Sequence, residues 1–315
     1  MIEKTSKIYI AGHQGMVGSA MLRLLNEKGY SNIIYRTSKE LDLRKQNDVQ
    51  GFIKEKMPDY IFLFAAKVGG IKVNIEHPAE FLYDNLLIEA NVINASYKYR
   101  VKKLLFLGSS CVYPRECHQP MKEEYLLSGK LEPTNEGYAL SKIAGLKLCE
   151  YYNKQFKANF ICLMPPNLYG PNDNFDVNSS HVIAGLIRKF IEAKVHNLPF
   201  VEVWGKGEAR REFLYVEDLA EACIHFMNNY NAKDLPSFVN VGYGKDVTIK
   251  ELAEIIKKEV GYKGKIIWNT SMPDGMPQKL LDIGLGKRFG WEPKTSLEVG
   301  IKKTIEWYKN HEITN

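Results

Sequence analysis

The sequence predicts an α/β protein with a Rossmann-type, doubly wound parallel sheet and a smaller C-terminal α/β substrate lobe. In the first half, short apolar runs alternate with helical patterns, which indicates a parallel sheet covered on both faces. A glycine-rich turn joins the first apolar run to the first helical segment. After about residue 167 the alternation loosens. We therefore assign 1–166 to a dinucleotide-binding domain, to which later segments can return, and 167–315 mainly to substrate binding.

The apolar runs and the helical patterns give approximate bounds for the individual elements. In the first half we expect strands at residues 7–12, 32–36, 60–66 and 102–108, and helices at 16–28, 79–99 and 136–156. In the second half we expect apolar strands at 238–242 and 266–268, and helices at 248–260 and 297–308.

The composition argues against nucleic-acid, membrane and metal partners. The 315 residues are 45% hydrophobic and 25% charged, as in a globular protein with a large core. The net charge is only +6 and the basic residues are dispersed, so we expect no nucleic-acid partner. No apolar run approaches the ~20 residues of a membrane span, so we expect no membrane partner. The five cysteines fit neither a zinc nor a disulfide framework, which indicates no metal and a cytoplasmic protein with reduced thiols.

The glycine-rich turn has the sequence Gly12-His13-Gln14-Gly15-Met16-Val17-Gly18. Its glycines permit a tight turn and a close approach to a pyrophosphate, and the next helix offers free N–H groups to the phosphates. Sites that prefer NAD usually place an acid after the second strand. This chain has Arg36 and Lys39 there, and a guanidinium can bind a 2′-phosphate. We therefore predict NADP(H) as the cofactor.

Three residues further along the chain could transfer a proton to or from a substrate. Tyr138 and Lys142 are four residues apart, on one face of the expected helix. A nearby ammonium favours the phenolate, and we expect it to lower the pKa of Tyr138 toward neutrality. Ser109 follows the fourth strand, where open parallel sheets bind ligands. The sequence thus predicts that these three side chains act on one substrate oxygen.

Several segments resemble the GDP-L-fucose synthase family of extended short-chain dehydrogenase/reductases. These segments are 12–19, 65–71, 104–111, 133–136, 167–171, 211–214, 273–275 and 279–282. The resemblance runs end to end, and Cys111 with His181 is its specific part. The chain departs from the family at Gln14 and Ser38, where arginines that bind the 2′-phosphate are common.

The resemblance implies a chemistry as well as a fold. The family inverts C3 and C5 of GDP-4-keto-6-deoxy-D-mannose and then reduces C4 with NADPH. Both carbons adjoin the ketone, so their protons are acidified by enolate formation. Cys111 and His181 would be the acid/base pair, and Ser109 and Tyr138 would steady the enolate oxygen. Tyr138 would then protonate O4, and Lys142 would hold the nicotinamide ribose.

The residues already discussed and the resemblance together give the expected ligand contacts. The residues that would contact the cofactor are Gly12, Gln14, Gly15, Met16, Val17, Gly18, Arg36, Lys39, Leu107, Lys142, Pro165, Asn167, Leu168 and His181. Those that would contact the GDP-sugar are Lys189, Trp204, Arg211 and Asp274. An arginine and a lysine suit a diphosphate, and tryptophan offers a flat apolar face.

Three alternatives stay open. The chain could reduce C4 of a related GDP-4-keto-6-deoxy sugar such as a heptose, with little or no epimerisation. A UDP-sugar 4-epimerase or dehydratase is more distant, because dehydratases usually carry an acid pair after the strand-four serine, where this chain has Cys111 and Val112. A non-catalytic dinucleotide sensor would typically lack Tyr138 or Lys142. The expected helices at 79–99 and 136–156 carry apolar residues on more than one face, so we also expect a homodimer.

Overall fold

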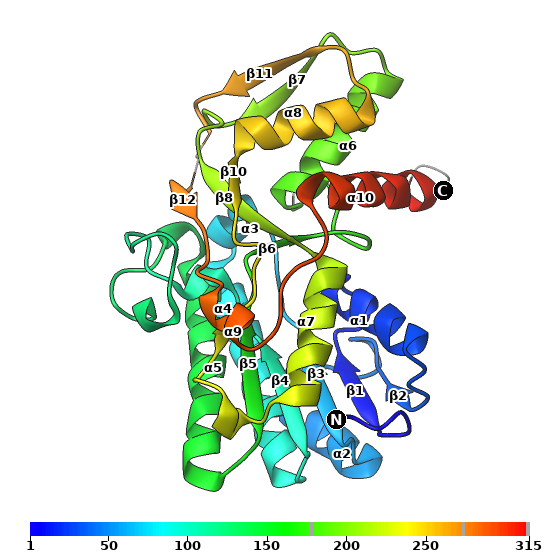
Figure 1. The fold of residues 1–315 in the computed structure, drawn as a ribbon, viewed down its shortest axis with the longest axis vertical. Coiled ribbons are helices and arrows are strands. Elements are labelled where there is room, and N and C mark those ends of the chain that lie inside the picture. Colours follow the sequence, from blue (N-terminus) through cyan, green and yellow to red (C-terminus); the bar gives the residue numbers. More distant parts are fainter. Residues whose placement is uncertain (177–178, 273–274, 313–315) are drawn as a thin grey trace.

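A computed structural model describes residues 1–176, 179–272 and 275–312 and shows two lobes, the larger at the bottom of Figure 1. The larger lobe holds a six-stranded sheet of order β2-β1-β3-β4-β5-β9, with all pairings parallel. Its strands are β1 (Ile8–Ala11), β2 (Ile33–Ile34), β3 (Tyr60–Leu63), β4 (Lys103–Leu107), β5 (Phe160–Met164) and β9 (Val239–Asn240). The predicted Rossmann-type fold class is confirmed.

Helices cover both faces of this sheet because successive strand residues point to opposite sides. In β4, Leu104 and Phe106 enter the core beneath α2 (Gln46–Lys56), α4 (Pro78–Lys98) and α5 (Glu136–Phe156). Leu105 and Leu107 enter the opposite core, beneath α1 (Met16–Glu27) and α7 (Val216–Asn229). The strands therefore read as continuous apolar runs, as the sequence suggested.

The smaller lobe is built on β8 (Arg210–Tyr215), which pairs with β6 (Asn167–Tyr169), β10 (Asp246–Thr248) and β12 (Gln278–Lys279). A second, two-stranded sheet joins β7 (Phe200–Trp204) to β11 (Lys265–Asn269). The third core of the protein lies between these strands and helices α6 (Val182–Val195), α8 (Ile249–Val260) and α10 (Leu297–His311). The remaining helices are α3 (Ile71–Glu76), α9 (Gly284–Arg288) and the short 3₁₀ helices η1 (Ser110–Val112), η2 (Glu123–Tyr125), η3 (Pro133–Asn135) and η4 (Ala232–Asp234).

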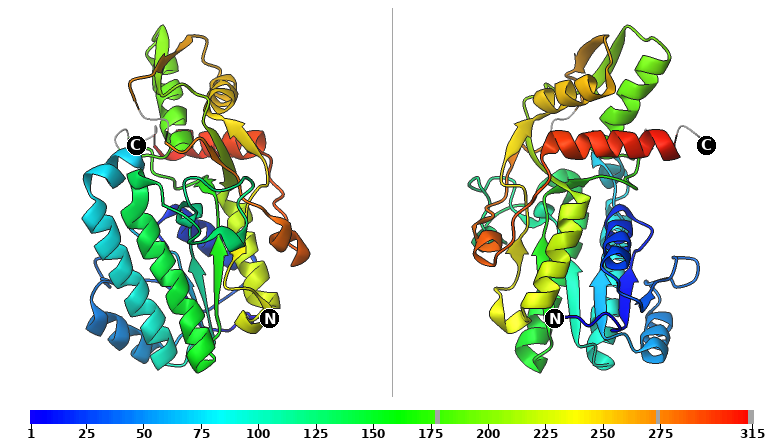
Figure 2. Two further views of the ribbon diagram at one scale, coloured as in Figure 1. Left: turned by 90° about the vertical axis from the view of Figure 1, so that its left-hand side faces the viewer. Right: turned by 45° about the vertical axis from the view of Figure 1, so that its right-hand side comes forward.

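The chain crosses between the lobes more than once after residue 167 (Figure 2). Helix α7 packs against α1, and β9 pairs with β5 at the edge of the large sheet. The segment after β12 is tied to a loop of the large lobe, because Met121 N donates to Leu280 O at 2.7 Å and Asp282 N donates to Met121 O at 2.8 Å. Segments of the second half thus complete the first lobe.

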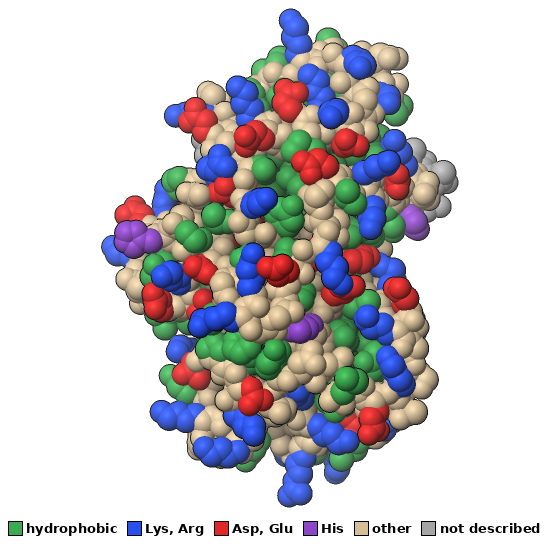
Figure 3. Space-filling view, in the orientation of Figure 1, with side chains coloured by type: hydrophobic (Ala, Val, Ile, Leu, Met, Phe, Trp, Pro, Cys, Tyr) green, Lys and Arg blue, Asp and Glu red, His purple; other side chains and the backbone are tan. Residues whose placement is uncertain are grey.

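The surface and the helices set limits on large partners. On the face in Figure 3, basic and acidic side chains are interspersed over both lobes. Among the described residues, no helix is long and apolar enough to cross a membrane, and no group of three or more His, Cys, Asp or Glu residues could hold a metal ion.

Candidate active site

The turn after β1 forms a cradle that has no room for a side chain at Gly12 or Gly18. Gly12 has φ +93°, and a Cβ there would lie 2.7 Å from the backbone N of Ala65. A Cβ on Gly18 would overlap the carbonyl of Gly12. Gly15 caps α1, and no side chain bonds to the first free N–H groups of the helix. These free donors and the helix dipole make the turn an anion-binding site.

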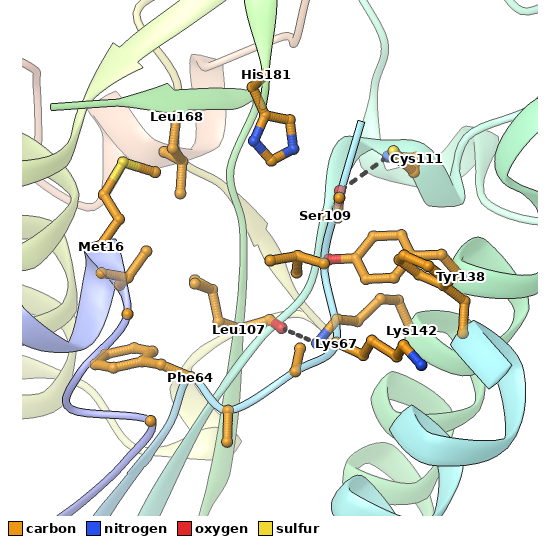
Figure 4. A pocket seen from close by; sticks show the side chains of 18 of the residues that line it. Met16, Phe64, Lys67, Leu107, Ser109, Cys111, Tyr138, Lys142, Leu168 and His181 are labelled. Atoms are coloured by element: carbon orange, nitrogen blue, oxygen red, sulfur yellow. Dashed lines mark hydrogen bonds between the residues drawn. The ribbon is translucent and has the colours of Figure 1, made fainter. Parts of the chain in front are cut away.

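A cavity of about 720 Å³ runs from this turn to the junction of the lobes (Figure 4). It lies at the carboxyl ends of the parallel strands, the usual ligand site of such sheets. Most residues predicted to bind cofactor or substrate line it, namely Gly12, Gln14, Gly15, Met16, Val17, Gly18, Arg36, Leu107, Ser109, Cys111, Tyr138, Lys142, Pro165, Asn167, Leu168, His181 and Arg211.

Three predicted site residues lie elsewhere, and a fourth is not described. Lys39 is exposed and does not line the cavity. Lys189 and Trp204 also lie outside it but face each other in the small lobe, where Lys189 Nζ is 5.9 Å from the centre of the indole ring and donates to Glu202 O at 3.0 Å. Asp274 lies outside the described residues.

Tyr138 and Lys142 project from α5 toward Ser109, but the electrostatics differ from expectation. Lys142 Nζ donates to Leu107 O at 3.1 Å and lies 5.8 Å from the centre of the Tyr138 ring. Burial raises the pKa of Tyr138 far above its ordinary value, the charges of Cys111 and Glu89 raise it further, and the hydrogen bond with Ser109 lowers it less. The expected lowering of this pKa was wrong because Lys142 Nζ turns to Leu107 O and Glu89. Tyr138 therefore stays protonated, the form that donates a proton.

Cys111 sits in the 3₁₀ helix η1, directly after the strand that ends near Ser109. Asn135 Nδ2 donates to its Sγ at 3.1 Å, and Lys279 Nζ donates to it at 3.3 Å. Burial raises the pKa of this thiol, but the Lys279 charge and the hydrogen bonds outweigh burial, so the pKa is lowered. A thiolate is the basic form of cysteine, so the site is built to hold a base here.

His181 approaches the same cavity from the small lobe, as the residue that caps α6 (Figure 4). Its Nδ1 lies 4.0 Å from Oδ1 of Asp173, whose side chain is buried. Burial raises the pKa of Asp173 to about 6, although the His181 charge opposes this. The imidazole is 42% exposed and can exchange protons with a ligand in the cavity.

Sequence reasoning missed three residues that the structure brings to this site. Lys279 and Asn135 lay inside segments that carried the resemblance, but neither residue was linked to Cys111. Glu89 was counted only as part of an expected helix, yet it pairs with Lys142 at 3.1 Å. These partners are distant in sequence, and in a single sequence only their presence in such segments could have drawn attention to them.

Comparisons with known proteins agree with this geometry. Residues 8–242 match the model of the NAD dependent epimerase/dehydratase family. The chain is 52% identical to a putative GDP-L-fucose synthase 2 of Arabidopsis thaliana, covering 98% of this chain and 93% of the relative. It is 49% identical to the GDP-L-fucose synthase of Escherichia coli K12, covering 96% of each. The chain belongs to the GDP-L-fucose synthase family.

Solved structures related to this GDP-L-fucose synthase family member include sugar reductases. A GDP-6-OMe-4-keto-L-xylo-heptose reductase from C. jejuni superimposes with a TM-score of 0.95 at 40% identity, over 98% of this chain and 99% of that one. A GDP-mannoheptose C4 reductase from Campylobacter jejuni with NADP bound gives 0.90 at 39% identity, over 98% and 100%. The predicted family is thus confirmed, and the family fold also serves reductases of other GDP-sugars.

Proposed function

We propose that the protein catalyses NADPH-dependent 3,5-epimerisation and 4-keto reduction of GDP-4-keto-6-deoxy-D-mannose to GDP-L-fucose. The observation that carries this proposal is a single cavity lined by a cation-paired cysteine, a histidine from the other lobe, and the Ser–Tyr–Lys set. An epimerase needs one group to remove a proton and another to return one on the opposite face. A plain ketone reductase needs only the Ser–Tyr–Lys set.

The residues present fit NADP(H). The cradle at Gly12 and Gly18 excludes side chains and suits a pyrophosphate, and Arg36 lines the cavity where a 2′-phosphate would bind. Lys142, Leu107, Asn167 and the neighbouring lining residues would hold the nicotinamide end. When bound, the reduced cofactor supplies the hydride for C4 of the sugar.

The epimerisation follows from the charges around Cys111. Its thiolate, stabilised by Lys279, removes the proton next to the ketone. Ser109 and the protonated Tyr138 donate hydrogen bonds to the oxygen on which negative charge develops, which stabilises the enolate. His181, reaching in from the small lobe, returns a proton on the opposite face. Cys111 then releases its proton to solvent and His181 takes one up from solvent, so that repetition at the second carbon inverts both centres.

The reduction uses the same oxygen and a different proton. Tyr138 is protonated and hydrogen-bonded to Ser109, so it can donate its proton to O4 as the C4 carbonyl is reduced. Lys142, with its Nζ 5.8 Å from the centre of the Tyr138 ring, would hold the nicotinamide ribose beside this proton donor.

Isotope exchange tests this function directly. The purified protein is incubated in deuterated water with NADPH and GDP-4-keto-6-deoxy-D-mannose, while the reduced-cofactor absorbance is followed. We expect oxidation of the cofactor and a product labelled at both C3 and C5. Product without label at either carbon would replace this proposal with plain C4 reduction.

That second candidate has its own support. The structural match to the heptose reductase from C. jejuni is close, with a TM-score of 0.95. The choice between the two depends on whether Cys111 and His181 exchange protons with the substrate. A GDP-4-keto-6-deoxy-heptose offered in the same assay distinguishes them, because a heptose reductase turns it over faster and leaves C3 and C5 unlabelled.

We also propose that the active form is a homodimer in the cytoplasm. Helices α4 and α5 lie side by side (Figure 2) and expose aromatic side chains to solvent. Tyr97 of α4 stacks on Phe156 of α5 at 4.5 Å, and both are partly exposed, which supports a two-fold helix bundle. A reducing compartment is supported because Cys111 must stay a free thiol to act as a base.

A further inference from the structure

A buried carboxylate lies behind the reduction machinery. Glu89 of α4 is only 1% exposed, and its Oε1 lies 3.1 Å from Nζ of Lys142. Among the described residues, neither of its oxygens accepts a hydrogen bond from the backbone or from a second side chain. A buried carboxylate with a single partner costs stability, so its placement calls for a role beyond packing.

The packing makes room for this carboxylate. A Cβ on Gly145 of α5 would lie 2.6 Å from Oε2 of Glu89 and 2.6 Å from the ring edge of Phe106. Alanine is the better helix former by about 1 kcal/mol, so the glycine trades helix stability for the close approach of Glu89. Lys142 Nζ also lies 4.9 Å from the Phe106 ring centre. The ammonium is therefore held by a carboxylate, the Leu107 carbonyl and an aromatic face.

The charge of Glu89 reaches the proton donor as well. The described titratable groups that interact with it are Lys142, Tyr138 and Cys149, all on α5. Its negative charge raises the pKa of Tyr138. Burial raises the pKa of Glu89 itself to about 7, although Lys142 opposes this. Glu89 is thus neutral in mild acid and ionised in mild base.

We propose that Glu89 is a positioning residue whose carboxylate holds Lys142 in place beside Tyr138 above neutral pH. This proposal rests on the proposed function only in taking Tyr138 and Lys142 as the reducing set. Glu89 acts through these two side chains and does not touch the sugar.

The pH profile of the Glu89→Gln variant tests this role. Glu89 ionises as the pH rises through about 7, so kcat/KM of the parent protein should increase there as its carboxylate takes hold of Lys142. We expect the variant to lack this increase and to fall several-fold below the parent above pH 7. Below about pH 6, where Glu89 is already neutral, the variant and the parent should agree. Glu150→Gln on α5, which removes a partly exposed partner of Lys147, is the matched control and should leave the profile unchanged.

Two measurements without substrate complete the test. With ¹³C-labelled glutamate carboxyls, the resonance that is lost in Glu89→Gln should titrate near pH 7 in the parent protein. The dissociation constant for NADPH, measured by fluorescence, should rise several-fold in the variant above pH 7 because Lys142 is less well held. Both results stand even if the protein does not turn over the GDP-sugar, so failure of the proposed function is distinguishable from failure of this proposal.

Clear outcomes overturn the proposal. A Glu89→Gln enzyme that loses activity equally at every pH gives Glu89 a structural role alone. A carboxyl that titrates near the ordinary value of ~4.3 does the same. If Glu89→Gln fails to fold, Glu89→Asp keeps the charge and withdraws it by one methylene. That variant should keep the increase in kcat/KM near pH 7 and weaken NADPH binding, and unchanged NADPH binding would count against the proposal.

Discussion

Replacement of Lys279 by methionine should remove the charge that keeps Cys111 basic while preserving the bulk of the side chain. The two groups meet at 3.3 Å, and Lys279 is only 8% exposed. Hydrogen bonds to charged groups contribute about 1.5–3 kcal/mol, which corresponds to a rise of roughly 1–2 units in the thiol pKa. Asn135 still donates to the sulfur at 3.1 Å, so the lower half of that range is the better expectation.

The consequence is a thiolate that forms at higher pH. Cys111 acts as a base only when deprotonated, so C3 and C5 exchange should rise with pH through its pKa. Where pH lies below that pKa, we expect Lys279→Met to slow exchange and alkylation of Cys111 by iodoacetamide about 10-fold, with recovery in more alkaline solution. Mass spectrometry of the Cys111 peptide separates it from the four other free thiols.

Lys287→Met is the matched control, because Lys287 is an exposed lysine of α9 that pairs with Glu292. Its loss should change neither the rate of isotope exchange nor the rate of alkylation. If the alkylation profile of Cys111 is the same in Lys279→Met and the parent protein, the ammonium does not set the charge of the thiol, and the electrostatic argument for the base fails.

Three further predictions concern the cofactor, the division of labour and the assembly. Arg36→Ala should weaken NADPH by on the order of 1.5–3 kcal/mol and leave NADH nearly unaffected; equal kcat/KM for both cofactors in the parent protein contradicts this. Cys111→Ser should suppress deuterium exchange by roughly 10²–10⁴, whereas Tyr138→Phe should spare some exchange and cripple reduction; loss of both activities in each variant would refute the separation of roles. Light scattering at micromolar concentration should give a dimer mass for the parent and a monomer mass for Tyr97→Glu; a monomeric parent excludes the proposed interface.

Local patterns in the sequence were enough to predict the framework of the protein. The expected helix at 136–156 matches α5 (Glu136–Phe156), and the first turn forms the cradle that its glycines predicted. Both depend on residues that are neighbours in the chain, where helical periodicity and glycine geometry act directly. The first four strands were predicted slightly too long, and some of the extra residues at their carboxyl ends, such as Phe64 and Ala65, leave the ladder and line the cavity.

The charges of the site could not be predicted in the same way. Lys279 and Cys111 are 168 residues apart, so their contact depends on how the two lobes dock. Lys142 was expected to lower the pKa of Tyr138 because the two share a helix face. The ammonium of Lys142 instead pairs with Glu89, which lies on another helix. Spacing within one helix gives proximity, whereas the orientation of an ammonium depends on every group around it.

The crossing of the chain between the lobes limits how this enzyme can be re-engineered. A chimaera that exchanged everything after residue 167 for the corresponding half of a relative would also replace β9, which pairs with β5, and α7, which packs on α1. It would separate Lys279 from the loop at Met121 that anchors the segment after β12. A graft meant to change sugar preference should therefore exchange individual residues of the cavity lining and keep the strands that link the two lobes.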